Sequence, residues 1–252
     1  MVRFLISNLL TNNEVMAKKL SISSMEKKII LEPVPKDSHI IRCKVLIVCE
    51  GEKTEPNYFK SFSMMKNSSG MVYEVSTGGG GINTTQVVDK AIELRDKAIK
   101  AGDPYDSVWA VFDKDDFNPS MFDNAINKAD AQGISCAWSN EAFELWYVYH
   151  FDDRCTPMNR STYKKTITSR VRSAGFKKYT YKKNDPNMRQ VLSNCMCDEA
   201  VAIKRASRQA STYLNRKFST HNPCTVVYRL ISLLNGNDED FNKRIRKELS
   251  RK

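Results

Sequence analysis

Short apolar runs recur along the chain and predict strands. From Val45 to Cys49 five consecutive residues are apolar and largely β-branched, which is typical of a central strand covered on both faces. This strand begins near Lys44, and the chain then turns at Gly51. Three later runs predict further strands at residues 71–77, 107–113 and 134–139.

Helical patterns separate these strands. A helix is expected to start near Pro56, because proline suits a first helical turn. Further helices are expected over residues 84–101, about 120–132 and, as a buried helix, 140–151. This alternation predicts an α/β fold: a parallel sheet with right-handed crossovers, flanked by helices on both faces. Sites in such sheets lie beyond the carboxyl ends of the strands.

The two ends of the chain differ from this α/β part. Residues 1–41 lack clear periodicity and are expected to form an N-terminal extension or connector. After Asp153 the strand signals stop, and helices are expected at about 161–174, at 187–218 with a possible break, and at 224–235. The last residues, from Asn237, predict a charged and frayed tail. We therefore expect an α/β domain over 42–152 and a basic, mainly helical extension over 153–252.

Composition narrows the class of protein. The 252 residues contain an ordinary share of hydrophobic residues, enough for a substantial core. No apolar run is long enough to cross a bilayer and the N-terminus lacks the features of a signal peptide, so a cytoplasmic protein is expected. Seven cysteines without a CxxC pair favour reduced thiols, and with only three histidines they disfavour a zinc site.

The positive charge is distributed unevenly. The whole chain carries +11, but residues 151–252 contain 23 Lys and Arg against 9 Asp and Glu, a net +14, which leaves residues 1–150 at −3. A basic half beside an acidic half suggests a polyanion bound by one and acted on by the other. The alternative is that the basic helices only keep the protein soluble.

Two acidic clusters follow predicted strands. Glu50 ends the first strand, and Asp113, Asp115 and Asp116 follow the third, so both clusters should lie at the same edge of the sheet. In an extended segment Asp113 and Asp115 point the same way and can share one cation. Such hard oxygen ligands suit Mg²⁺ or Mn²⁺, and with Glu50 they suffice for one ion or two. Two ions would support in-line attack on a phosphodiester.

Other sites with similar acidic patterns fit less well. An EF-hand loop is excluded, because Phe117 and Asn118 stand where an oxygen ligand and glycine belong. A phosphatase with an aspartate nucleophile would carry its acidic pair after the first strand. The Asp-x-Asp motif of glycosyltransferases fits locally, but leaves Glu50 and the basic half unexplained. A structural role in capping the next helix stays open, although two clusters at one edge disfavour it.

Longer motifs carry a family resemblance. The acidic arrangement resembles the Toprim domain of topoisomerases, primases and OLD-type nucleases. The motifs LIVCEGEKTEPNYF, YDSVWAVFDKDDF and SNEAFELWYVYHF, with NPCTVVYRLISLL nearer the end, resemble the RloB family of prokaryotic defence proteins. That family includes the second component of the AbiL abortive-infection pair. The resemblance runs from about Arg42 to Leu234 and leaves residues 1–40 outside.

The resemblance implies a Toprim-like, metal-dependent nuclease that acts in phage defence beside an AAA/ABC-type ATPase encoded with it. By the same resemblance Glu50 matches a general acid/base, and Asp113 and Asp115 match the metal-binding pair. Glu55 and Glu144 match further acidic positions of the motifs, whereas Glu141 departs from them, since a small residue or proline is expected there. The candidate catalytic residues are Glu50, Lys53 and Glu144, and the candidate ligands of Mg²⁺ or Mn²⁺ are Glu50, Glu55, Asp113, Asp115 and Asp116.

Several residues near the motifs allow two interpretations. The Lys53 ammonium can stabilise a pentacovalent phosphate, or it can form a salt bridge with a neighbouring glutamate. The glycines at 78–81 can let a phosphate approach the backbone, but a flexible connector is favoured without a P-loop lysine. His150 can shuttle protons, but its place at the end of an apolar helix favours a buried histidine. Trp146, Tyr147 and Tyr149 are expected in the core.

The basic half offers a substrate surface. Residues 163–184 interleave Lys and Arg with Phe176, Tyr179 and Tyr181, and exposed rings among cations are typical of proteins that bind single-stranded or looped nucleic acid. Residues 204–218 add a second basic stripe. A solvated helical face, or a docking surface for an ATPase partner, would give the same pattern. The candidate nucleic-acid contacts are Lys164, Lys165, Arg170, Arg172, Lys177, Lys178, Tyr179, Tyr181, Lys182 and Lys183.

Two functions follow from these patterns. The first is a nuclease that cuts DNA or RNA, including tRNA, between which the sequence does not choose. The second is a non-hydrolytic Toprim-fold module that binds nucleic acid or the ATPase partner. The oligomeric state is open in both cases.

Overall fold

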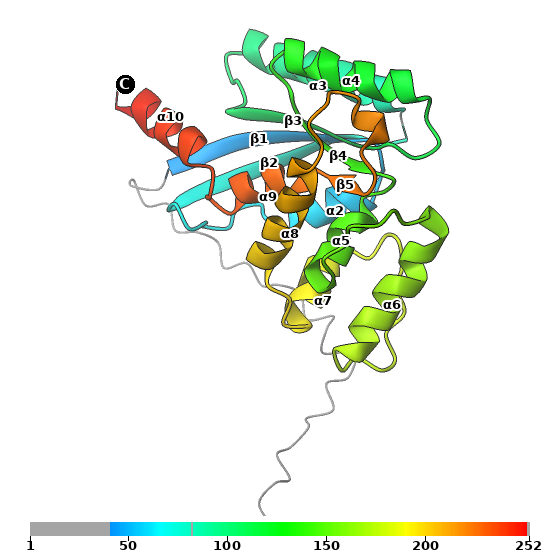
Figure 1. Ribbon diagram of the computed structural model, residues 1–252. Helices are drawn as coiled ribbons and strands as arrows, with labels where there is room; N and C mark the ends of the chain where they lie inside the picture. Colours follow the sequence, from blue (N-terminus) through cyan, green and yellow to red (C-terminus); the bar gives the residue numbers. More distant parts are fainter. Residues whose placement is uncertain (1–40, 82, 251–252) are drawn as a thin grey trace, which may run out of the picture.

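A five-stranded sheet forms the centre of the protein (Figure 1). The computed structural model describes residues 41–250 except residue 82, so the expected N-terminal extension lies almost wholly outside the described residues. The strands have the order β2-β1-β3-β4-β5, and the first four run parallel, as predicted. Their bounds are β1 Ile41–Cys49, β2 Met71–Gly79, β3 Ser107–Asp113, β4 Ser135–Asn140 and β5 Cys224–Thr225.

The fifth strand corrects one prediction. β5 lies antiparallel beside β4, with Ser139 opposite Thr225 and their hydroxyl oxygens 2.8 Å apart. The prediction that strands stop after Asp153 was therefore wrong, because two residues are too few to show strand periodicity. The predicted domain boundary after residue 152 stays a prediction, and the sheet takes strands from both sides of it.

Helices cover both faces of the sheet, as the apolar run of β1 predicted. Val45 and Ile47 face one hydrophobic cluster, whereas Leu46 and Val48 face the other, and each is at most 2% exposed. Helices α3 (Thr84–Lys100) and α4 (Pro119–Ala131) cover the second face. Helices α2 (Thr54–Lys60), α5 (Glu144–Phe151), α8 (Glu199–Ser211) and α9 (Val227–Leu234) lie on the first (Figure 1).

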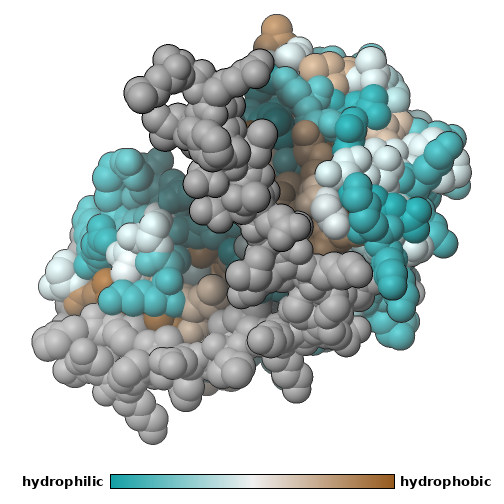
Figure 2. Space-filling model, turned by 90° about the horizontal axis from the view of Figure 1, so that it is seen from below, coloured by the Kyte–Doolittle hydropathy of each residue, from teal (hydrophilic) through white to brown (hydrophobic). Residues whose placement is uncertain are grey.

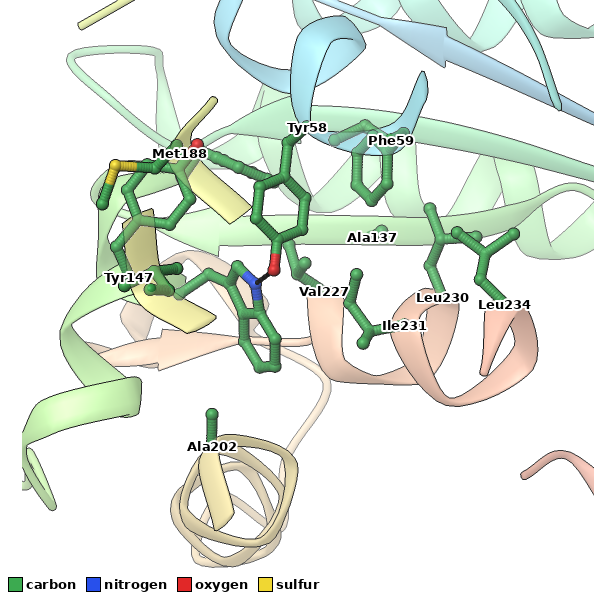
Figure 3. Close-up of a cluster of buried hydrophobic side chains, with 14 of the residues drawn as sticks. Tyr58, Phe59, Ala137, Tyr147, Met188, Ala202, Val227, Leu230, Ile231 and Leu234 are labelled. Carbon is green, nitrogen blue, oxygen red and sulfur yellow. Dashed lines mark hydrogen bonds between the residues drawn. The ribbon is translucent and has the colours of Figure 1, made fainter. Parts of the chain in front are cut away.

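Aromatic side chains fill the first face. Helix α5 has no polar stripe, and Trp146, Tyr147 and Tyr149 are at most 1% exposed, which confirms their prediction as core residues. The indole Nε1 of Trp146 donates a hydrogen bond of 2.8 Å to the hydroxyl of Tyr58 on α2 (Figure 3). This contact joins the helix that follows β1 to the helix that follows β4.

The region after Asp153 is mainly helical, as predicted. The expected break within 187–218 is present between α7 and α8. Seen from below, the described surface is mainly hydrophilic (Figure 2). Within the described part of the chain, no helix has both the length and the apolar character needed to cross a membrane. The elements of this region before α8 are the 3₁₀ helix η1 Arg160–Thr162, α6 Tyr163–Ser173 and α7 Met188–Asn194, and the 3₁₀ helix η2 Phe218–Thr220 follows α8.

The expected frayed tail is instead a packed helix, α10 (Glu239–Leu249). The Asp238 carboxylate accepts a hydrogen bond of 2.9 Å from the Phe241 backbone N–H and so caps the helix. Phe241 and Ile245 are 7% and 4% exposed, and the Phe241 ring packs on Tyr73 of β2. The prediction failed because only two buried apolar residues stand among many charges, and the other contacts of α10 are hydrogen bonds from polar side chains such as Arg244 and Arg246.

Candidate functional site

The turn after β1 is held in place by the glycine segment that follows β2. The backbone N–H groups of Gly80 and Gly81 donate hydrogen bonds of 2.9 Å to the carbonyls of Cys49 and Glu50. Gly79 has φ +84°, and a Cβ there would lie 2.3 Å from the Cys49 carbonyl oxygen, so only glycine fits. The segment is thus hydrogen-bonded to the turn, and Gly78 and Gly79 belong to β2 and not to a connector.

A pocket of about 350 Å³ opens where β1 and β3 end. The predicted carboxylates Glu50, Glu55, Asp113 and Asp115 line it together, although they come from two separate segments. Glu55, in the first turn of α2, is 6% exposed. We call these four residues and the space between them the acidic pocket.

Glycine at position 51 lets two of these glutamates approach. A Cβ on Gly51 would lie 2.3 Å from Oε2 of Glu55, so any larger residue would displace that carboxylate. Glu50 is fixed from β3, since its Oε2 accepts a hydrogen bond of 3.2 Å from the Asp113 backbone N–H. The first strand, its turn and the third strand therefore set the pocket's geometry jointly.

The backbone conformation that brings the two aspartates to the pocket differs from the extended one expected. Asp113 is the last residue of β3, but Asp115 lies in a turn with φ +43°, so the segment is not extended. The Asp115 backbone N–H donates a hydrogen bond of 3.1 Å to the Glu141 carbonyl. Asp116 is exposed and does not line the acidic pocket, so the structure does not bring it together with the other four candidate ligands.

Burial and mutual repulsion raise the pKa values of three pocket carboxyls, those of Glu50, Glu55 and Asp113. Burial, with the Glu55 charge, raises the pKa of Glu50 to about 7, although the Asp113 N–H opposes the shift. Burial and the Glu144 charge raise the pKa of Glu55. Burial and the charges of Glu55, Glu144 and Glu50 also raise the pKa of Asp113. The pocket is therefore a place where added positive charge is favourable.

Arg160 is the site residue that the sequence did not reveal. Its guanidinium pairs with the Asp115 carboxylate, and it reaches the pocket from η1 in the C-terminal region. The Glu141 carboxylate accepts a hydrogen bond of 2.8 Å from the Arg160 backbone N–H and so supports this position. A lone arginine in an irregular segment gives no periodic signal, so only the fold brings it to the pocket.

The two remaining catalytic candidates lie at the margin. Lys53 is exposed on the lining of the acidic pocket, and among the described residues it forms no salt bridge. Glu144 is 7% exposed, and its Oε1 accepts a hydrogen bond of 3.0 Å from the Tyr181 hydroxyl. Glu144 lines a neighbouring pocket, which it shares with Arg160 and Lys183, and we call this the middle pocket.

The carboxylate side chains of the acidic pocket are chemically suitable ligands for a hard divalent cation. Glu50, Glu55, Asp113 and Asp115 offer carboxylate oxygens, which Mg²⁺ and Mn²⁺ prefer, in a pocket where burial and neighbouring negative charge raise the pKa values of Glu50, Glu55 and Asp113. In the arrangement described here, however, no three Asp, Glu, His or Cys side chains of residues 41–250, residue 82 aside, surround a metal position. These four residues would hold the ion once their side chains turned toward it.

Comparison with known proteins identifies the family. The family model described as RloB-like protein matches residues 45–234. The chain belongs to the RloB-like family. Neither curated proteins nor solved structures gave a match. The matched region contains both acidic segments and helices α6 to α9, so it includes the whole acidic pocket of this RloB-like chain, whereas α10 lies outside it.

Most of the predicted nucleic-acid contacts lie on an exposed face around α6. Lys164, Lys165, Arg172 and Lys177 line an open groove, which we call the lysine groove. Lys182 lines the middle pocket, and Lys183 lines both the middle and the acidic pockets. Lys178 is exposed as well, and Arg170 forms a salt bridge with Asp152.

The aromatic part of that prediction was wrong. Phe176, Tyr179 and Tyr181 are only 6%, 6% and 3% exposed, and they pack into the core of this RloB-like chain. The Tyr179 hydroxyl points to the Met188 sulfur, and the Tyr181 hydroxyl is bound to Glu144. Neither tyrosine can stack on a nucleic-acid base without leaving the core.

His150 lies away from the acidic pocket. It is 6% exposed, its Nδ1 is 3.0 Å from the Trp146 carbonyl oxygen, and burial lowers its pKa to about 4. This confirms the interpretation of His150 as a buried histidine. Of the cations in the second basic stripe only Arg205 is partly buried, and it donates to the carbonyl oxygens of Tyr149 and His150. Lys204, Arg208, Arg216 and Lys217 are exposed, and Arg208 pairs with Asp153 at the surface.

Proposed function

We propose that this RloB-like chain is a Mg²⁺- or Mn²⁺-dependent nuclease that hydrolyses phosphodiester bonds in DNA or RNA, tRNA included. The observation that carries the proposal is the convergence of Glu50, Glu55, Asp113 and Asp115 in one pocket beside a lysine-rich surface. A carboxylate pocket attracts cations and repels bare phosphates, so the two surfaces together suit metal-assisted phosphodiester chemistry.

Each residue of the pocket has a distinct part in this proposal. When bound, the divalent cation would lower the pKa of a water molecule and withdraw charge from the phosphate. Glu50, fixed by the Asp113 N–H, is placed to exchange a proton with the attacking water or the leaving oxygen. Lys53 can contact the phosphate from the rim, and Arg160 can do so if it leaves Asp115. Glu144 orders the wall between the pockets through Tyr181.

The cellular role is part of the same proposal. Its support is membership of the RloB-like family together with the motif resemblance to abortive-infection proteins. We propose that the chain acts in the cytoplasm in anti-phage defence, beside an AAA/ABC-type ATPase of the same operon. The partner would hold a toxic nuclease inactive until infection.

A second function has one observation in its favour. Arg160 already pairs with Asp115, and no three acidic side chains of the described residues surround a metal position. A non-hydrolytic module that binds nucleic acid or the ATPase would need no such arrangement. Metal-dependent cleavage distinguishes the two functions.

The test is cleavage of labelled duplex DNA, single-stranded DNA and total tRNA, with and without the ATPase partner. Each reaction contains Mg²⁺, Mn²⁺ or EDTA, and the Asp113→Ala, Asp115→Ala double variant is compared with the single variant Asp116→Ala. Asp116 is a matched control, because it is an aspartate of the same segment that lies outside the acidic pocket.

The nuclease proposal expects metal-dependent cleavage that the double variant loses by at least about 100-fold and the control retains. Glu50→Gln should lose cleavage to a similar extent while its circular dichroism spectrum stays unchanged. Absence of cleavage under all conditions, together with absence of metal binding by calorimetry, would instead favour the non-hydrolytic module.

A further inference from the structure

The acidic pocket continues into a basic surface through shared residues. Arg160 and Lys183 line both the acidic and the middle pockets, and Lys164 and Thr180 line both the middle pocket and the lysine groove. The middle pocket therefore adjoins the acidic pocket on one side and the lysine groove on the other. The α6 surface is defined by the cations along it: Arg160, Lys164, Lys165, Arg172, Lys177 and Lys183.

The chemistry of the α6 surface matches phosphate groups. The lysine groove is lined only by Lys, Arg, Ser and Thr side chains, without a carboxylate. Lys164, Lys165 and Lys177 are exposed, and no described residue forms a salt bridge with them. Ammonium and hydroxyl groups are the donors that contact sugar and phosphate in nucleic-acid complexes, and they carry no base preference.

The same segment has no described aromatic surface for base stacking. Its rings belong to Tyr163, Phe176, Tyr179 and Tyr181, which are 2–6% exposed. Tyr181 is held twice: its hydroxyl donates to Glu144, and its backbone N–H donates to the Thr168 hydroxyl at 3.0 Å. Proteins that bind single strands without sequence preference use exposed rings for a large part of their affinity. That contribution is missing here.

We infer that the α6 surface binds the phosphate backbone of base-paired nucleic acid, a duplex or the stem of a hairpin, and leads one strand into the acidic pocket. This rests on the proposed nuclease function and names the form of its substrate. A duplex concentrates more phosphate charge along its length than a single strand, so a surface that offers only phosphate contacts gains more from a duplex.

Arg160 lies between the acidic pocket and the rest of the α6 surface. It lines the acidic and middle pockets, and its partner Asp115 belongs to the acidic pocket. A phosphate that enters through the middle pocket from Lys164 would meet Arg160 before it reaches the four carboxylates of the acidic pocket. Arg160 can then exchange one anion, Asp115, for another, the phosphate, which leaves the Asp115 oxygens available to a cation.

The test is binding of a labelled hairpin RNA, a DNA duplex and their single strands, measured by fluorescence anisotropy in EDTA over a series of salt concentrations. EDTA prevents metal-dependent cleavage, so binding is measured separately from nuclease activity. Lys164→Ala, Lys177→Ala is compared with Lys97→Ala, Lys100→Ala, which removes the same charge from the exposed surface of α3 on the other face of the sheet.

We expect the paired forms to bind at least about 10-fold more tightly than the single strands. The Lys164, Lys177 variant should bind about 10-fold more weakly, and the slope of log K against log salt should fall by about two. The α3 variant should match the wild type.

Equal or tighter binding of single strands would overturn the inference, as would an α3 variant that loses as much affinity as the α6 variant. Either result can coexist with metal-dependent cleavage, so the nuclease proposal would stand. Duplex binding at the α6 surface without cleavage would support this inference while the nuclease proposal failed.

Discussion

Glu50, Glu55 and Asp113 lie buried in one pocket without a salt-bridge partner among the described residues, and a single replacement measures the cost of keeping them there. Burial and the charges of Glu55, Glu144 and Glu50 raise the pKa of Asp113. Above pH 3.8, the ordinary value for aspartate, the unfolded state releases the Asp113 proton more readily than the folded state does, and this disfavours folding. Asp113→Asn removes this penalty and should stabilise the metal-free protein at pH 8 by about 1 kcal/mol. Urea unfolding in EDTA measures this free energy.

Asp116→Asn is the control for that experiment, since Asp116 is exposed outside the pocket and should change stability by less than about 0.5 kcal/mol. Adding Mg²⁺ should raise the melting temperature of the wild type and of the control more than that of Asp113→Asn. An Asp113→Asn variant that is less stable than the wild type in EDTA would show that repulsion does not dominate at this position.

The sequence revealed those residues of the pocket that follow a buried strand. Glu50, Asp113 and Asp115 stand directly after apolar runs, and parallel topology then brings them to one edge. Arg160 follows no such run and is brought to the pocket only by tertiary structure. Tyr179 and Tyr181 alternate with lysines, and this spacing cannot tell a ring that faces the core from one that faces solvent.

At the scale of single elements, helix α10 depends on a few apolar contacts. Phe241→Ala removes a ring that is 7% exposed and packs on Tyr73, so it should lower the free energy of unfolding by about 3 kcal/mol. Lys243→Ala is the control: Lys243 is exposed in the same helix and pairs only with Glu239, so its loss should cost less than about 0.5 kcal/mol. Thermal and urea unfolding measure both variants. Equal changes in the free energy of unfolding would mean that α10 adds little to the stability of the fold.

Helix α5 makes stability depend on pH through His150. Folding lowers the pKa of His150 from 6.5 to about 4 because the ring is buried. The contribution of the neutral His150 to the free energy of unfolding is complete above about pH 6.5. It is lost as the pH falls toward 4, because the unfolded state binds the proton more tightly. The loss approaches about 3 kcal/mol.

Because the pocket carboxyls titrate in the same range, the quantity to measure is the difference between wild type and His150→Gln. Urea unfolding between pH 4 and 7 should show a steeper loss of stability on acidification for the wild type. Parallel curves for the two proteins would mean that His150 is solvated or paired in the folded state.

The elements that sequence patterns missed share one physical trait. Strands β1 and β3 have continuous buried runs: β3 was predicted to the residue, and β1 was predicted with its last residue correct, although it begins at Ile41 and not near Lys44. β5 has two residues, and α10 has few buried apolar side chains, so neither leaves enough of a period to detect. Both are defined by partners far away in the chain, Asn140 and Tyr73 among them.

At the scale of the whole molecule, the basic C-terminal region is attached directly to the acidic pocket. The Thr54 hydroxyl, at the start of α2, donates a hydrogen bond of 2.8 Å to the Lys183 carbonyl. Thr54→Val keeps the shape and removes this bond. Hydrogen exchange around residues 182–185 should become about 5-fold faster, since one buried hydrogen bond contributes about 1 kcal/mol.

Thr212→Val is the matched control, because the Thr212 hydroxyl donates only to the Gln209 carbonyl at the end of α8. Mass spectrometry of exchanged peptides measures both variants. Unchanged exchange around Lys183 in Thr54→Val would mean that other contacts hold this loop on α2.

The hydrogen bond between Trp146 and Tyr58 also gives this protein an optical property. All three tryptophans of the chain, Trp109, Trp138 and Trp146, are at most 6% exposed, so their fluorescence should be emitted at short wavelength, as from an apolar solvent. Trp146 lies two residues after Glu144, and its partner Tyr58 three residues after Glu55. A movement of α2 relative to α5 alters the surroundings of that indole. Binding of a ligand in the acidic pocket should then be measurable as a shift in the wavelength of tryptophan fluorescence, without a label.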